Sequence, residues 1–189
     1  MRLVLASASP RRSDLLRTVG LDFEVDPADV DESVRAGEDA LDYVARIARA
    51  KCLAVATRHR TDVVLAADTT VAVDGEILGK PADADAATAM LTRLSGETHQ
   101  VHTALAVWSG GVTLEQVVTT EVTFASLTDT EIAAYVAIGE SFDKAGGYGL
   151  QSAGAVLVER IDGSPTNVIG LPVRETLAIV RAAGLSASG

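Results

Sequence analysis

The residues that could do chemistry begin with two adjacent arginines near the N-terminus. Arg11 and Arg12 follow Ser7, Ser9 and Pro10, in what reads as the first turn of a helix. A helix N-terminus carries partial positive charge and free N–H groups, so two arginines suit that position best when an anion binds there. Backbone N–H groups, serine hydroxyls and guanidinium groups would then form a phosphate site. The alternative is that both arginines face solvent or pair with surface acids.

Four further charged residues stand at positions where ligand chemistry is common. Lys51 lies within the apolar stripe of an expected helix, so its side chain either extends to the edge or is aimed at a negative group. Asp68 closes the clearest buried-strand segment, a usual place for ligand chemistry in open α/β sheets, although the same residue could merely cap a turn. Glu32 belongs to an acidic loop that would ordinarily be solvated, and Lys80 lies in a tight Gly-Lys-Pro connection.

The glycine-rich segment at residues 143–152 combines charge with directed hydrogen-bonding groups. Its glycines would allow the backbone to approach a ligand closely, while Lys144 and Gln151 supply a cation and an amide. Glycine-rich surface loops are common, so this segment alone is weak evidence. Together with the charged residues above it suits a polyphosphate, because cations spread phosphate charge and carboxylates hold a divalent ion or orient water. No Gly-x-x-x-x-Gly-Lys-Ser/Thr loop is present, which excludes a P-loop NTPase.

Composition narrows the class of protein. A length of 189 residues suits a single domain, with two lobes around a cleft and a frayed tail over residues 185–189. The net charge of −10 argues against nucleic-acid or anionic-membrane partners. A single cysteine, Cys52, permits neither an intramolecular disulfide nor a cysteine zinc site. No signal-peptide pattern or long apolar run occurs, so we expect a cytoplasmic enzyme or binding protein.

These chemical groups must be positioned by alternating strands and helices. Alternation with apolar neighbours places His99 and His102 on the surface of a strand. Apolar runs and turn signals predict strands at residues 3–5, 23–25, 62–68, 71–73, 76–78, 100–108, 112–124 and 155–161. Helical periodicity and caps predict helices at about residues 10–19, 39–58, 83–94, 129–138 and 172–183, with a turn at 162–165.

The chain resembles the Maf family of nucleoside triphosphate pyrophosphatases from Leu3 to about Leu177. Several separate motifs carry the resemblance in the right order: residues 5–12 (LASASPRR), 67–69 (ADT), 79–81 (GKP), 94–101 (LSGETHQV), 143–146 (DKAG), 148–151 (YGLQ) and 170–172 (GLP). The resemblance implies an α/β fold, with an elongated mixed sheet flanked by helices and a central cleft, shared in outline with inosine triphosphate pyrophosphatases. Members are often homodimers.

The resemblance also implies an activity. The family cleaves a nucleoside triphosphate between its α and β phosphates, giving the monophosphate and pyrophosphate, with a divalent metal such as Mg²⁺ or Mn²⁺. The complete Asp-Lys-Ala-Gly-x-Tyr-Gly-x-Gln pattern is that of the branch acting on dTTP and UTP, with modified pyrimidine nucleotides as further candidates. The rival interpretation is a nucleotide-binding regulator of cell division or septum formation, in which hydrolysis is incidental.

Matching the motifs residue by residue assigns expected roles. Asp68 resembles the proton acceptor that activates water, or a metal ligand, and Glu32 a second acidic residue of the catalytic and metal site. The expected cationic and polar binders of the phosphates are Ser7, Arg12, Lys51 and Lys80, of which Lys80 is also placed in the catalytic group, with Lys144 as a further substrate contact. The residues linked to pyrimidine selectivity are Arg11, Thr69 and Gln151. Gly147 stands where some relatives have alanine, and no catalytic position departs from the pattern.

Overall fold

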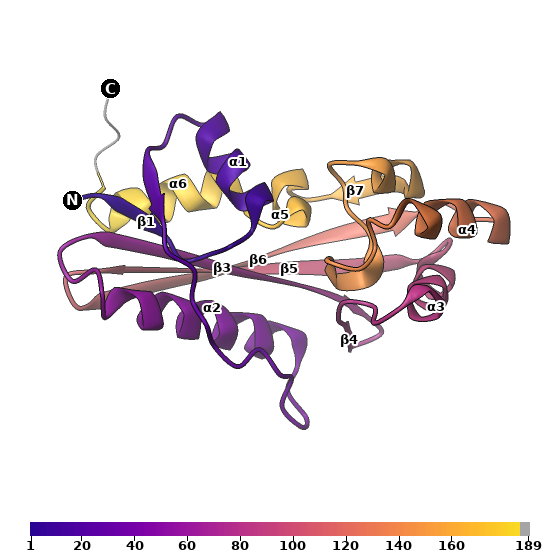
Figure 1. Ribbon diagram of the computed structural model, residues 1–189, viewed down its shortest axis with the longest axis horizontal. Helices are drawn as coiled ribbons and strands as arrows, with labels where there is room; N and C mark the ends of the chain where they lie inside the picture. The colour runs from indigo at the N-terminus through magenta and orange to yellow at the C-terminus, as the bar shows by residue number, and fades with distance from the viewer. Residues whose placement is uncertain (186–189) are drawn as a thin grey trace.

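The computed structural model describes residues 1–185 of the chain as an elongated α/β structure (Figure 1). Its strands are β1 (Leu3–Leu5), β2 (Phe23–Val25), β3 (Val63–Val73), β4 (Glu76–Leu78), β5 (Thr98–Ser109), β6 (Val112–Phe124) and β7 (Val158–Asp162). Its helices are α1 (Pro10–Thr18), α2 (Ala40–Ala56), α3 (Ala84–Leu94), α4 (Asp129–Ile138), α5 (Pro165–Ile169) and α6 (Val173–Ala182), with short 3-10 helices at Ala145–Gly147 and Ala153–Leu157.

The strands form one mixed seven-stranded sheet, which confirms the predicted fold class. Its order is β2-β1-β3-β5-β6-β7, and β4 pairs with β3. β1 is parallel to β2 and β3, whereas the remaining pairs are antiparallel. The long strands β3, β5 and β6 run along the length of the molecule, with α2 on one face and α1, α5 and α6 on the other (Figure 1).

The alternation of side chains along β1 shows how both faces are buried. Leu3 and Leu5 join a core with α1 and α6, whereas Val4 and Ala6 pack with the apolar side of α2 on the opposite face. A third apolar cluster, around Phe124, lies where α3 and α4 cover the far end of the sheet. These packed layers fix the strands that carry the polar residues between them.

A gap along one edge of β3 creates the opening in which ligand chemistry is possible. β1 pairs with β3 over residues 63–65, and β4 pairs with the same edge over residues 71–73. Residues 66–70 of that edge lie between the two partners, while β5 covers the other edge over residues 64–72. The predicted strands at 62–68 and 71–73 are thus one continuous strand, so Asp68 lies mid-strand in the gap and the prediction of a strand end there was wrong.

Three other sequence expectations need correction. β7 begins at Val158 rather than 155, because Ala153–Leu157 forms a 3-10 helix. The turn expected at 162–165 instead leads into helix α5, whose N-cap Ser164 accepts a hydrogen bond from the backbone N–H of Asn167. His99 and His102 are buried rather than exposed, because β5 is covered on both faces.

The C-terminal part of the chain continues past α6 for a few described residues. The backbone N–H of Leu185 donates a hydrogen bond to the carbonyl of Val180, and its side chain packs against the α1 and α6 core. The expected frayed tail otherwise falls on residues 186–189, which lie outside the described residues. None of the helices within residues 1–185 combines the length and the apolar character that crossing a bilayer requires.

Candidate active site

A cleft with a volume of about 820 Å³ opens over the gap in the sheet. It is bounded by β3, the start of α1, the loop before α2, the connection after β4 and the segment 143–151. The structure brings all ten residues predicted for the site into its wall: Ser7, Arg11, Arg12, Glu32, Lys51, Asp68, Thr69, Lys80, Lys144 and Gln151. Their placement together is a structural finding, whereas their individual roles remain predictions.

Lys51 joins the two acidic residues of the cleft. Its Nζ lies 2.8 Å from Asp68 Oδ1 and 2.9 Å from Glu32 Oε1. The side chain reaches from α2 toward β3 and is buried, so the lysine in the apolar stripe is aimed at negative groups rather than extended to the helix edge. Asp68 is also buried, whereas the side chain of Glu32 is half exposed at the cleft wall.

The environment of Asp68 suits a proton acceptor. Burial raises the pKa of its carboxyl group, and the positive charges of Lys51 and Arg12 oppose that rise. Among residues 1–185 the hydrogen-bond partner of the Asp68 side chain is Lys51, whose Nζ donates to Asp68 Oδ1. Oδ2 is therefore available to a water molecule or a metal ion, and a carboxylate with a raised pKa is a stronger base than an ordinary aspartate.

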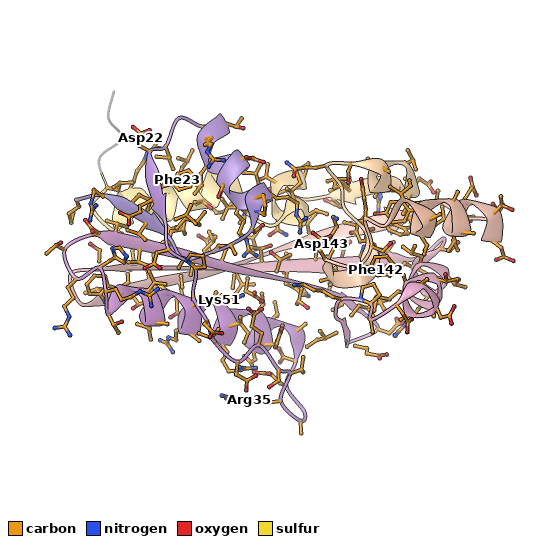
Figure 2. All side chains as sticks on the ribbon, in the orientation of Figure 1. Asp22, Phe23, Arg35, Lys51, Phe142 and Asp143 are labelled. Atoms are coloured by element: carbon orange, nitrogen blue, oxygen red, sulfur yellow. The ribbon has the colours of Figure 1, made fainter. Side chains whose placement is uncertain are left out.

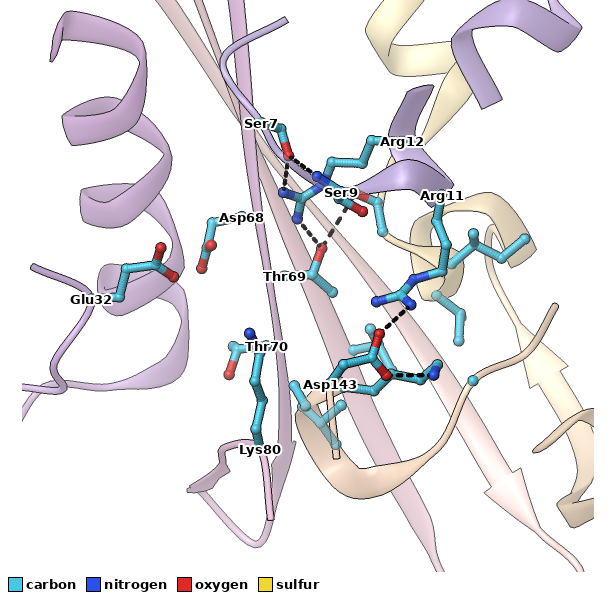
Figure 3. A pocket seen from close by; sticks show the side chains of 18 of the residues that line it. Ser7, Ser9, Arg11, Arg12, Glu32, Asp68, Thr69, Thr70, Lys80 and Asp143 are labelled. Carbon is cyan, nitrogen blue, oxygen red and sulfur yellow. Dashed lines mark hydrogen bonds and ion pairs between the residues drawn. The ribbon is translucent and has the colours of Figure 1, made fainter. Parts of the chain in front are cut away.

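Arg12 is a buried cation whose fork is fixed by three oxygen atoms. Nε donates to the carbonyl of Gly170 at 2.8 Å, Nη1 to Ser7 Oγ at 3.1 Å, and Nη2 to Thr69 Oγ1 at 3.1 Å (Figure 3). Burial lowers the pKa of the guanidinium, and the nearby carboxylate of Asp68 offsets part of that effect. Its three partners are neutral, so its positive charge is available to an anion in the cleft.

The N-terminus of α1 adds backbone donors beside Arg12. Ser9 occupies the N-cap position but makes no side-chain capping hydrogen bond, and its own backbone N–H donates to Ser7 Oγ at 3.2 Å. Pro10 is the first helical residue, as predicted. The start of α1 thus lines the cleft and has no side-chain cap, so the backbone N–H groups of Arg11 and Arg12 are suited to binding an anion.

Sequence reasoning missed the residues that bring Gly170 to Arg12. Asn167 on α5 is fully buried, and its Nδ2 donates to the carbonyl of Val101 at 2.9 Å and to Thr120 Oγ1 at 3.0 Å. The carbonyl of Asn167 accepts a hydrogen bond from Thr103 Oγ1. These contacts attach α5 to β5 and β6, and the Ser164-Pro165 pair was the only local signal of a helix start.

Arg11 points away from Arg12 toward the glycine-rich segment. Its Nη1 lies 3.0 Å from Asp143 Oδ2, while Lys144 Nζ lies 2.6 Å from Asp143 Oδ1 and donates to the carbonyl of Glu140 at 2.6 Å (Figure 3). The side chains of the two arginines thus lie in different parts of the cleft lining, whereas the roles expected for them, phosphate binding by Arg12 and base selection by Arg11, remain predictions. Neither is a purely solvent-facing residue.

Buried aromatic groups support the glycine-rich segment from below. Tyr148 Oη lies 2.7 Å from His99 Nε2, and both rings pack edge-on against Phe124. Tyr135 Oη accepts a hydrogen bond from the backbone N–H of Gly149 at 3.2 Å. A Cβ at Gly149 would lie 2.5 Å from Lys144 Cε, so a larger residue there would displace the end of the lysine side chain.

Lys80 and Gln151 complete the wall from two different segments. Both side chains are exposed and line the cleft, Lys80 from the connection after β4 and Gln151 from the end of the glycine-rich segment. Figure 2 places Lys51 and Asp143, which also line the cleft, on the middle portion of the molecule. An exposed lysine and an exposed amide in the cleft wall are well suited to contact a ligand that enters from solvent.

The donor set fits a hard divalent cation. Among the described residues no three His, Cys, Asp or Glu side chains form a metal cluster. Mg²⁺, however, needs only one or two protein carboxylates together with substrate phosphates and water. Lys51 Nζ occupies the point between Glu32 Oε1 and Asp68 Oδ1, so the remaining oxygens of these two carboxylates, beside that ammonium group, are the ligands that the cleft would offer to the ion.

This fold and this cleft define an α/β protein built to hold a polyanion against a buried carboxylate. The family model described as Maf-like protein matches residues 2–183, and the chain belongs to that family. The structure of the Staphylococcus aureus Ham1 protein has the same fold, with a TM-score of 0.54 and 16% identity over 96% of this chain and 97% of that chain.

Curated relatives match nearly the whole chain. A protein from Anaeromyxobacter dehalogenans is 54% identical over 97% of this chain and 94% of its own length, and it is named dTTP/UTP pyrophosphatase. Proteins of the same name from Myxococcus xanthus and Methylobacillus flagellatus are 52% and 50% identical, over 97% and 100% of this chain and 93% and 96% of their own lengths.

Proposed function

We propose that this protein is a nucleoside triphosphate pyrophosphatase that hydrolyses dTTP and UTP to the monophosphate and pyrophosphate. Relatives of 50–54% identity along nearly the full length carry that name. The structural observation that carries the proposal is the buried Asp68, joined through Lys51 to Glu32, in a cleft whose other walls are cationic. Such a cleft offers both a base for water and counter-charges for a triphosphate.

Asp68 is the group that activates the attacking water. Its Oδ1 is held by Lys51, and its Oδ2 accepts a proton as the water oxygen bonds to phosphorus and the phosphoanhydride bond breaks. The raised pKa of Asp68 strengthens it as a base, and the positive charges of Lys51 and Arg12 oppose that rise and favour the ionised carboxylate. Lys51 fixes the orientation of the carboxylate through the same contact.

The cations and helix N–H groups bind the phosphates. Arg12 retains N–H donors on Nη1 and Nη2 beyond those used by Ser7 and Thr69. Ser7 Oγ accepts hydrogen bonds from Arg12 and from the Ser9 N–H, so its own proton is free to be donated to a phosphate oxygen. Lys80 at the rim then neutralises charge that develops on the pyrophosphate leaving group.

Glu32 and Asp68 are the residues that would hold the divalent metal. Mg²⁺ or Mn²⁺ suits their carboxylate oxygens, and when bound it would neutralise phosphate charge and polarise the phosphoryl group. Glu32 reaches the site from the loop before α2, with its side chain half exposed. We assign it the second acidic role on that basis.

Pyrimidine selection belongs to the wall opposite the acidic pair. Arg11 lies across the cleft from Asp68 and Glu32 (Figure 3), and Gln151 also lines the cleft, which supports the role that the motifs predict for them. Thr69 Oγ1 instead bonds to Arg12 Nη2 and Thr103 Oγ1, so its influence on selectivity passes through the position of Arg12. Modified pyrimidine nucleotides remain candidate substrates, and the homodimeric state and cytoplasmic location remain predictions from the sequence.

A panel of normal and modified nucleoside triphosphates, assayed for pyrophosphate release with Mg²⁺ and with Mn²⁺, tests this proposal. We expect dTTP and UTP to give the highest kcat/KM and purine triphosphates to give little turnover. Without a divalent metal we expect no detectable pyrophosphate release. Equal rates for all triphosphates, or release of inorganic phosphate, would contradict it. An Asp14→Asn variant serves as a control, because Asp14 pairs with Arg17 on the exposed side of α1.

A further inference from the structure

Three charged groups at the cleft wall form an ordered array of hydrogen-bonding functions. Asp143 accepts from Arg11 Nη1 through Oδ2 at 3.0 Å and from Lys144 Nζ through Oδ1 at 2.6 Å. The array therefore runs donor, acceptor, donor, from the guanidinium through the carboxylate to the ammonium (Figure 3). Asp143 is its most accessible member, with 64% of its side chain exposed, against 30% for Arg11 and 13% for Lys144.

The array complements one kind of nucleobase edge. Uracil and thymine present an acceptor, a donor and an acceptor, namely O4, the N3–H group and O2. Cytosine instead presents an amino donor, the N3 lone pair and O2, so a carboxylate that faces its N3 would meet a second acceptor. We propose that Asp143 is a specificity-determining residue, whose carboxylate accepts the N3–H of uracil or thymine while Arg11 donates to an adjacent carbonyl of the ring.

The charge state of Asp143 supports this assignment. Partial burial works to raise the pKa of its carboxyl group, but hydrogen bonds from Lys144 and Arg11 outweigh that effect and hold the pKa below its ordinary value. The group is thus ionised and acts only as an acceptor, and each carboxylate oxygen has a second lone pair for a ligand. The two cations also neutralise it, which removes the repulsion that a free carboxylate would exert on a triphosphate.

The position of the array suits the base end of a nucleotide. Asp68 and Glu32 lie at one side of the cleft, and Arg11 and Asp143 lie at the other (Figure 3). A substrate whose phosphates meet Asp68 extends its remaining part toward the glycine-rich segment that carries Asp143. This inference rests on the proposed hydrolysis of dTTP and UTP, and it adds Asp143 as the acceptor that excludes cytosine.

The test compares kcat/KM for UTP, CTP and N3-methyl-UTP, whose methyl group replaces the N3 proton. The wild-type protein should reject N3-methyl-UTP by about 10–100-fold, the worth of one hydrogen bond to a charged group in a site built for it. Asp143→Ala should reduce that discrimination to a few-fold. Asp143→Asn, whose amide can donate, should raise the CTP to UTP ratio by about tenfold.

Asp14→Asn is the matched control. Like Asp143→Asn it removes one negative charge, but Asp14 lies on α1 outside the cleft, so the relative kcat/KM values for UTP, CTP and N3-methyl-UTP should stay unchanged. If Asp143→Ala and Asp143→Asn slow all substrates by one common factor, Asp143 reads no base and the inference is overturned. The same follows if wild-type protein accepts N3-methyl-UTP as readily as UTP. No hydrolysis of UTP by wild-type protein would instead refute the proposed function itself.

Discussion

Lys51 Nζ lies 2.8 Å from Asp68 Oδ1 and 2.9 Å from Glu32 Oε1. A single ammonium group therefore links the buried carboxylate of Asp68 on β3 to the half-exposed carboxylate of Glu32 in the loop before α2. The link crosses three elements, because Lys51 belongs to α2. One helix thereby sets both the orientation of the base and the position of the second acid. The distance between Asp68 and Glu32 therefore depends on how α2 holds the loop that carries Glu32.

Replacement of the base is the simplest test of the assigned roles. Asp68→Asn should lower kcat for dTTP by about 10²–10⁴-fold, the usual contribution of a general base, while nucleotide binding is retained. Isothermal titration with a non-hydrolysable dTTP analogue would measure the binding. A variant that loses binding and turnover together would show that Asp68 acts in substrate affinity rather than in proton transfer.

The same variant separates the enzyme from the rival role in cell division. If binding alone mattered, cells carrying Asp68→Asn would keep the division phenotype of the wild-type protein. Our account predicts that any such phenotype is lost together with hydrolysis. Microscopy of septum spacing in cells that express each form would decide between the two.

The pH profile of kcat should report the environment of Asp68. Activity requires the ionised carboxylate, and burial raises its pKa, so kcat should fall at a higher pH than for an ordinary aspartate as the solution is acidified. Lys51 opposes that rise, so Lys51→Met should move the acidic limb to still higher pH as well as lower the plateau. An acidic limb that stays in place, or moves to lower pH, would contradict the assignment.

Arg46 is predicted to position Glu32 without touching substrate. It pairs with both carboxylate oxygens of Glu38, at 2.5 and 2.7 Å, and donates to the carbonyl of Ser33 at 2.9 Å. Tyr43 Oη, one turn earlier on α2, donates to the carbonyl of Glu32. Arg46 therefore attaches the loop that carries Glu32 to the helix that carries Lys51.

Removing this attachment should weaken catalysis and metal use together. On the proposed role of Glu32 as a metal ligand, Arg46→Met should lower both activity and apparent metal affinity by about 10–100-fold, as the loss of a residue that supports a ligand does. Arg49→Met is the matched control: within residues 1–185, Arg49 on the same helix pairs with Glu115 at the surface, so this variant should behave like wild type. In a Glu32→Gln background the effect of Arg46→Met should vanish, and persistence there would exclude a role through Glu32.

The two adjacent arginines should respond differently to lysine. Arg12→Lys loses the planar fork that serves Gly170, Ser7 and Thr69 in a buried setting, which should cost about 2–4 kcal/mol of unfolding free energy and most of the activity. Arg11→Lys keeps an exposed pair with Asp143 and should cost under about 1 kcal/mol while changing base preference. Urea unfolding and substrate ratios would measure both, and equal losses of stability would contradict the division of roles.

Local patterns predicted most elements but not how the site is assembled. The capping box at Thr128 and Glu131 and the turn at Gly110-Gly111 act over a few residues, so the sequence reveals them directly. The gap beside Asp68 arises because β1 and β4 pair with separate parts of β3. No local signal encodes such long-range pairing, which explains why a strand end was predicted where the strand continues.

The motifs identified residues that meet in the cleft, yet they did not reveal its internal contacts. Lys51 was ambiguous from helical spacing alone, because an apolar stripe gives no information about what faces it across the sheet. The role of Asn167 in presenting Gly170 to Arg12 depends on β5 and β6, more than forty residues away in sequence. Burial of His99 likewise follows from layers that cover β5 on both faces.

The most direct test of the central claim is the identity of the products formed from dTTP, observed by ³¹P NMR in the presence of Mg²⁺. The account predicts that dTMP and pyrophosphate appear in equal amounts, and that Asp68→Asn protein under the same conditions forms neither at a comparable rate. Formation of dTDP and inorganic phosphate would contradict it, because the cleaved bond would then be the one between the β and γ phosphates.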